Sequence, residues 1–150
     1  MPELLEDAVQ KLKSMAGTIP VAWKRPRPNR LYFDVRAEDV RGLALIVSED
    51  FGARFATATG LDAGDELEVI YHFVYDAVGL VVNLRVKTPK SEARLPSLTT
   101  VVPPAEWIER EIRDLLGVEF DGHPRPERFI LADDWPEGVY PLRKEGRDGA

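Results

Sequence analysis

The sequence has no cysteine, only two histidines and no long apolar run. Without cysteine the chain cannot form a disulfide, bind an iron–sulfur cluster through thiolates or use a thiolate nucleophile, and most structural zinc sites are also excluded. The best apolar candidate, Leu80–Leu84, is far shorter than the roughly 20 residues that cross a bilayer. Residues 1–7 lack a basic region followed by an apolar core, so we expect no secretory signal.

The chain also lacks a positive net charge: its formal charge is −6 and its pI about 5.0. Such a balance argues against non-specific binding to nucleic acid or anionic lipid, both of which need a positive surface. One basic cluster stands out, formed by Lys24, Arg25, Arg27 and Arg30 and interrupted by two prolines. It is interpreted either as a solvated basic turn or as a docking patch for an acidic partner.

The 150 residues fit one domain with a sizeable core. Apolar residues at helical spacing predict helices over residues 3–16 and 37–49. A third helix follows two prolines and ends at Gly117, with Glu109–Arg113 and Arg110–Asp114 as opposite-charge pairs four residues apart.

Strand patterns occupy residues 31–35 and 54–59, and two further runs, 66–75 and 80–86, flank a glycine-containing turn as in a β-hairpin. Residues 88–97 are predicted to be a loop. The order of elements predicts an α+β domain, a mostly antiparallel sheet with helices packed on one face, over residues 1–117.

Residues 118–150 differ in character and are predicted to form an extended, proline-rich C-terminal segment of the same unit. Four prolines exclude a long helix or a central strand, yet large apolar side chains persist. We interpret the segment as wrapping a partner; the alternative is that it wraps its own domain.

Catalytic chemistry has little support in the residues. His72 lies in a strand pattern and is expected to be structural, and His123 lies in a turn with no second histidine nearby. Adjacent Asp133 and Asp134 point to opposite sides of an extended chain, so they would not converge without a turn. An autonomous enzyme using His123 and these two carboxylates is therefore disfavoured, and we expect no intrinsic catalysis, no metal and no cofactor.

Four linked motifs between Trp107 and Lys144 are specific. They are a Glu-Arg-Glu helix from Glu109, the turn Gly122-His123-Pro124, the turn Asp133-Asp134-Trp135, and the end Pro141-Leu142-Arg143-Lys144. In order and rough spacing they resemble the 30 kDa (C-type) subunit family of respiratory NADH dehydrogenase, complex I. The family includes the matching subunit of membrane-bound, energy-converting nickel–iron hydrogenases and formate hydrogenlyase. Arg113 and Leu116 depart from the commoner family residues. The run Arg113-Asp114-Leu115, together with residues 135–141, looks more like the hydrogenase branch.

The resemblance implies a cofactor-free structural and assembly subunit in the hydrophilic arm of a membrane-bound redox complex. Its partners would be the large nickel–iron or quinone-site subunit and the iron–sulfur subunits. It would be cytoplasmic and peripheral on the inner face of the membrane, contacting the membrane only through the complex and binding no nucleic acid. The alternative is an autonomous soluble binding or regulatory module with the same fold.

The resemblance also implies partner-binding residues. Aromatic anchors and charged groups that set register are expected among them. They are Trp107, Glu109, Arg110, Asp114, His123, Arg128, Asp133, Asp134, Trp135, Tyr140, Arg143 and Lys144.

Overall fold

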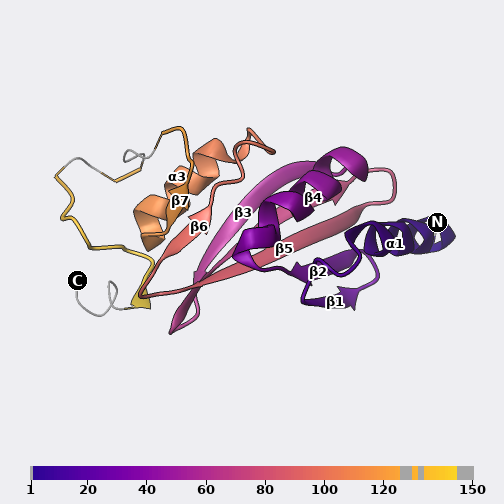
Figure 1. The fold of residues 1–150 in the computed structure, drawn as a ribbon, viewed down its shortest axis with the longest axis horizontal. Helices are drawn as coiled ribbons and strands as arrows, with labels where there is room; N and C mark the ends of the chain where they lie inside the picture. Colours follow the sequence, from indigo (N-terminus) through magenta and orange to yellow (C-terminus); the bar gives the residue numbers. More distant parts are fainter. Residues whose placement is uncertain (1, 126–129, 132–133, 145–150) are drawn as a thin grey trace.

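The computed structural model describes residues 2–125, 130–131 and 134–144. Its centre is a five-stranded sheet in the order β1-β2-β5-β4-β3 (Figure 1). The strands are β1 Ala22–Arg27, β2 Arg30–Asp34, β3 Arg54–Asp62, β4 Glu66–Tyr75 and β5 Leu80–Pro89, and the α-helices are α1 Pro2–Ala16, α2 Val40–Leu45 and α3 Ala105–Leu116. Strand pairs are antiparallel except β2 with β5, which run parallel.

The predicted α+β class is confirmed, with the helices packed on one face of the sheet. Alternate residues of β4 (Leu67, Val69, Tyr71 and Phe73) are buried in a single core with residues of α1, α2 and α3. Ile70 points to the opposite face and lies outside that core. The period-2 pattern of β4 therefore orients the sheet towards the helices.

The face of the sheet away from the helices carries a chain of polar side chains. His72 contacts Asn83 Oδ1 through Nδ1 at 2.6 Å and Thr59 Oγ1 through Nε2 at 2.8 Å. Asn83, almost fully buried, donates to Leu31 O at 3.2 Å. These contacts join β2, β3, β4 and β5, so His72 has the structural role expected of it.

Some predicted elements were wrong in extent. The basic cluster is no isolated turn but strand β1 with its hairpin partner β2. The predicted helix over 37–49 is split into a 3₁₀ turn at Ala37–Asp39, α2, and a wider π turn at Ile46–Asp50. Ser48 Oγ donates to Ala44 O at 2.7 Å where the pitch changes, a contact that often bends helices.

A second, two-stranded parallel sheet was also missed. Part of the predicted loop forms β6, Arg94–Pro96, and it pairs with β7, Glu119–Asp121. Val118 and Phe120 are buried in the core, so residues 118–121 pack with the rest of the domain. The small sheet and α3 gather at one end of the molecule, and α1 and β1 lie at the other (Figure 1).

The absence of a side chain at Gly60 lets α3 lie against β3. A Cβ there would lie 2.5 Å from Leu116 Cδ1 and 3.1 Å from Ile112 Cγ2. We expect Gly60→Val to lower the free energy of unfolding by about 1–3 kcal/mol through overpacking. Gly42→Ala in α2 is the control, because nothing lies within 4 Å of its Cβ position. Equal denaturant midpoints for Gly60→Val and the wild type would contradict this packing.

Candidate interaction site on α3 and the C-terminal segment

Helix α3 buries one face and exposes the other. Pro104 precedes its first turn, and Gly117 ends it in the left-handed conformation with φ 76°. Ala105, Ile112 and Leu116 pack into the core, whereas the side chain of Trp107 is 51% exposed. The helix is therefore both part of the core and part of the surface.

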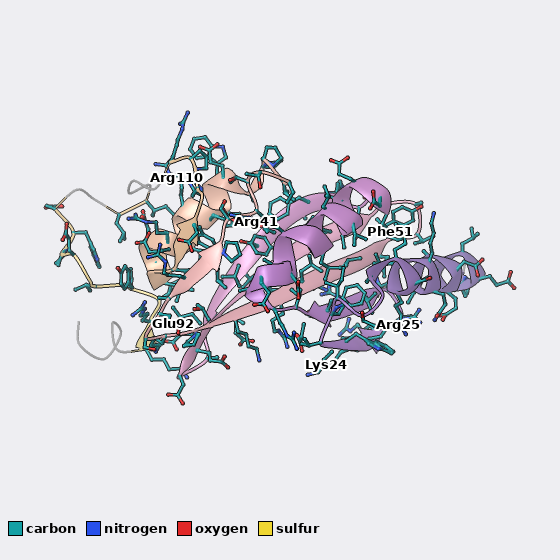
Figure 2. The ribbon with its side chains drawn as sticks, in the orientation of Figure 1. Lys24, Arg25, Arg41, Phe51, Glu92 and Arg110 are labelled. Atoms are coloured by element: carbon teal, nitrogen blue, oxygen red, sulfur yellow. The ribbon has the colours of Figure 1, made fainter. Side chains whose placement is uncertain are left out.

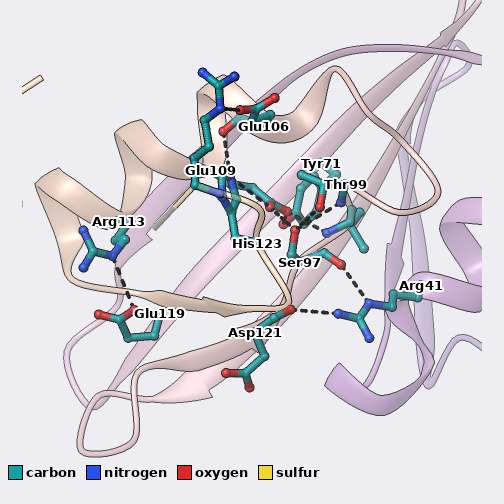
Figure 3. Close-up of polar contacts among 12 residues, drawn as sticks. Arg41, Tyr71, Ser97, Thr99, Glu106, Glu109, Arg113, Glu119, Asp121 and His123 are labelled. Carbon is teal, nitrogen blue, oxygen red and sulfur yellow. Dashed lines mark hydrogen bonds and ion pairs between the residues drawn. The ribbon is translucent and has the colours of Figure 1, made fainter. Parts of the chain in front are cut away.

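A buried carboxylate, Glu109, fixes the position of α3 (Figure 3). It accepts hydrogen bonds from Tyr71 Oη at 2.7 Å, Ser97 Oγ at 2.6 Å and Leu98 N at 2.8 Å. Burial raises the pKa of Glu109 above its usual value, although the three hydrogen bonds oppose the shift. The predicted Glu109–Arg113 pair was wrong: Glu109 points inward, and Arg113 Nε instead contacts Glu119 at 3.3 Å.

His123 joins the turn after β7 to the start of α3. Its Nδ1 accepts from Arg125 N at 2.9 Å, so the proton of the neutral ring sits on Nε2, which donates to Glu106 O at 2.9 Å. Its side chain is 4% exposed, and Nε2 lies 4.0 Å from Glu109 Oε1. Both ring nitrogens are thus engaged in holding local structure.

Arg41 was not identified from the sequence. From α2 it donates through Nε to Ser97 O and through Nη2 to Asp121 O, both at 2.8 Å (Figure 3). It thereby holds the ends of β6 and β7 against α2. A single arginine in an amphipathic helix gives no sequence signal for such a role, because its partners are backbone carbonyls.

Described parts of the C-terminal segment lie against the end of α3. Asp114 Oδ2 accepts from Ile130 N at 2.6 Å and from Leu131 N at 3.2 Å. Leu142 N donates to Leu115 O at 2.9 Å, and Arg143 Nε donates to Leu116 O at 2.6 Å. The last two contacts use carbonyls that every helix leaves unpaired at its C-terminus.

Asp62 at the end of β3 makes a second attachment. It accepts from Lys144 N at 2.8 Å and Gly64 N at 2.9 Å, and it pairs with Lys90 Nζ at 2.8 Å. Burial raises the pKa of Asp62, but these donors outweigh it and hold the pKa well below the usual range. The segment is therefore anchored at both α3 and the β3–β4 hairpin.

Helix α3 and the C-terminal segment carry four exposed apolar residues, which together are here called the α3–C-terminal surface. Its members are Trp107 (51% exposed), Ile130 (48%), Val139 (40%) and Leu142 (48%). The guanidinium carbons of Arg110 and Arg125 lie 5.4 and 6.0 Å from the Trp107 ring centre. Exposed large apolar side chains on α3 and the adjoining segment make this part of the molecule a candidate interaction site.

The structure places the predicted site residues in different surroundings. Glu109, Arg110, Asp114 and His123 have internal contacts, and Trp107 is exposed. Five others lie on the C-terminal segment: Asp134, Trp135, Tyr140, Arg143 and Lys144. Within the segment, Trp135 Nε1 donates to Val139 O at 2.7 Å. Tyr140 packs beside Gly117 at the end of α3. A groove of about 480 Å³ opens between α3 and the segment beside Trp135 and Tyr140. Arg128 and Asp133 lie outside the described residues.

The described residues contain neither a metal-binding cluster nor a membrane-crossing helix. No group of three or more His, Cys, Asp or Glu side chains among them could hold a metal ion. Across the same residues, no helix combines the length and apolar character that crossing a membrane requires.

Fold and site together define an α+β domain whose anchored C-terminal segment adds to an exposed apolar surface. The family model for the 30 kDa subunit of respiratory-chain NADH dehydrogenase matches residues 33–147. The chain belongs to this family, which confirms the resemblance found in the sequence.

Individual relatives agree. The chain is 37% identical over 136 residues to the C-type subunit of the NADH-quinone oxidoreductase of Acidothermus cellulolyticus, covering 85% of this chain and 70% of the relative. It is 32% identical to the corresponding protein of Sinorhizobium medicae, covering 97% of this chain and 73% of the relative. It spans about half of some other relatives, for example 47% of the corresponding Nocardioides protein.

Two solved structures share the fold. A chain of the membrane-bound sulfane sulfur reductase, an archaeal respiratory membrane complex, superposes with a TM-score of 0.79 at 29% identity, covering 93% of this chain and 84% of that one. A trypsin-resistant fragment of Nqo5 gives a TM-score of 0.62 at 25% identity, covering 83% of this chain and 99% of the fragment.

The raised pKa of Glu109 predicts a pH-dependent stability. A carboxyl whose pKa is raised by folding stabilises the fold below its unfolded pKa, about 4.5, and this contribution is lost as pH rises through the folded pKa. Relative to Glu109→Gln, the wild type should therefore lose stability as pH rises from 4.5 towards neutrality. The free energy of unfolding should fall by about 1.4 kcal/mol for every tenfold decrease that folding causes in the acid dissociation constant of Glu109.

Denaturant unfolding of both proteins across this pH range measures the effect. Glu111→Gln serves as the matched control, because it removes one carboxylate from the same helix. A constant difference between wild type and Glu109→Gln at every pH would contradict the raised pKa.

Proposed function

We propose that this chain is a cofactor-free structural subunit in the hydrophilic arm of a membrane-bound respiratory complex. It would brace the large nickel–iron or quinone-site subunit and contact the iron–sulfur subunits, on the cytoplasmic side of the membrane. Family membership supports a place in such a complex. The observation behind the bracing role is the α3–C-terminal surface, whose apolar residues are exposed.

The arrangement suits a surface that receives a partner without rearranging. Glu109, Asp114 and Asp62 fix α3 and the segment by hydrogen bonds inside the chain, so less conformational entropy is lost on binding. Trp107 with its two flanking arginines has the composition found at interface hot spots. The absence of cysteine in the 150 residues is compatible with electrons passing through other subunits.

The alternative, an autonomous binding module, has one observation in its favour. The described parts of the C-terminal segment pack on their own domain, as a self-contained module would require. Purification of the tagged chain from its native membranes, followed by mass spectrometry, separates the two. Recovery with a large subunit and iron–sulfur subunits supports the proposal, and recovery of the chain alone contradicts it. Membership of the hydrogenase branch stays a prediction that the same experiment tests.

Trp107 should contribute strongly to assembly and little to folding. We expect Trp107→Ala to reduce recovery of the other subunits about tenfold or more, because interface hot spots are concentrated in such aromatic side chains. Its melting temperature should stay near that of the wild type, since half of the side chain is already exposed.

Leu45→Ala is the matched control, an exposed apolar side chain (43%) on α2 and not part of the α3–C-terminal surface. Loss of subunits with Leu45→Ala as large as with Trp107→Ala, or full assembly by both, would contradict the assignment of this surface.

A further inference from the structure

The hairpin of β1 and β2 concentrates positive charge in a chain that is acidic overall. Val21 to Phe33 contain four cations and no acid, in a chain whose net charge is −6, so the remainder carries −10. Residues 1–32 lie outside the stretch that the family model matches. The hairpin also sits at the end of the molecule opposite α3 (Figures 1 and 2).

Within the described part of the chain, only one of the four cations has a partner. Arg25 Nη1 pairs with Glu6 at 2.7 Å, and its Nε donates to Pro28 O at 3.0 Å. Lys24, Arg27 and Arg30 are exposed, and their side chains make no ion pair or hydrogen bond with the described residues.

The register of the hairpin places two of these cations against each other. Arg27 and Arg30 stand directly opposite across the β1–β2 pair. Like charges in directly opposed positions destabilise a sheet, so this pair costs folding energy. The fold supplies no compensating contact from the described residues, whereas a bound carboxylate would remove the repulsion.

The hairpin is held in place from the side of α1. The Arg25–Glu6 pair links β1 to α1, and Lys13 Nζ lies 3.3 Å from the centre of the Trp23 ring. Trp23 and Val21 beside the cations are 51% and 56% exposed. Cations flanked by exposed apolar groups on a braced hairpin suit recognition of a protein segment.

We infer that the basic hairpin is a second docking surface, whose occupant is an acidic, extended segment of another subunit of the complex proposed above. A flat anionic lipid surface fits less well, because the carboxylate of Glu6 on α1 lies 2.7 Å from Arg25 and would face the lipid too. Pro26 and Pro28 carry no backbone N–H, so recognition rests on the side-chain cations rather than on continued strand pairing.

The substitution Arg27→Glu separates a docking role from a folding role, because it should weaken partner binding without lowering the stability of the chain. The substitution turns the opposed like charges into an opposite-charge pair, so the melting temperature of the chain should hold or rise. Binding of an acidic segment should fall about tenfold. Arg36→Glu is the matched control, an exposed arginine outside the hairpin.

The readout is carbodiimide coupling in the complex purified from native membranes, which joins the Lys24 amine to a carboxylate in contact with it. We expect amide links from Lys24 to acidic residues of another subunit, reduced about tenfold in Arg27→Glu and unchanged in Arg36→Glu. Links from Lys24 only to carboxylates of its own chain, with the other subunits present, would overturn this inference alone. Recovery of the chain without other subunits would overturn the proposed function as well.

Two further outcomes decide against the inference. A lower melting temperature for Arg27→Glu would give the arginine pair a folding role. Flotation of the wild-type chain with phosphatidylserine vesicles, lost in Arg27→Glu, would assign the hairpin to lipid headgroups instead.

Discussion

The hydrogen bonds to the buried Glu109 carboxylate are the interaction on which the rest of this structure depends. They join three parts of the chain that are distant in sequence: Tyr71 on β4, the Ser97–Leu98 turn after β6, and α3 itself. Removing such an acceptor leaves buried donors unpaired, at a cost of about 1–3 kcal/mol each. Glu109 therefore fixes where α3 lies, and so where the α3–C-terminal surface is presented.

The anchoring of the C-terminal segment follows from that position. Asp114 and the last carbonyls of α3 bind the segment from one side, and Asp62 binds it from the other. Several residues of the four motifs between Trp107 and Lys144 therefore make contacts inside the chain. These contacts hold the segment so that Ile130, Val139 and Leu142 are exposed. The basic hairpin at the far end is separate from this system and has its own brace on α1. The two docking surfaces that we propose therefore lie at opposite ends of the molecule.

Periodic patterns made the helices and the β4–β5 hairpin predictable, because each buries one continuous face. Strand β1 was not recognised because it contains three cations and Pro26. The three-residue strands β6 and β7 pair with each other, and neither is long enough to show a pattern in the sequence. Glu109 was assigned to the surface because helical spacing shows which residues share a face but not which face turns inward. The clamp by Arg41 has backbone partners and thus no sequence signature.

The central claim is that the α3–C-terminal surface contacts another subunit. The solvent accessibility of Trp107 in the membrane-bound complex tests it most directly. Hydroxyl-radical footprinting compares its oxidation rate in the membranes with that in the isolated chain, and Leu45 serves as the internal reference. If the chain is a structural subunit, Trp107, Val139 and Leu142 should be strongly protected from oxidation in the membranes. The oxidation rate of Leu45 should change little. Equal oxidation rates in both samples would mean that the α3–C-terminal surface faces water, and would contradict the account.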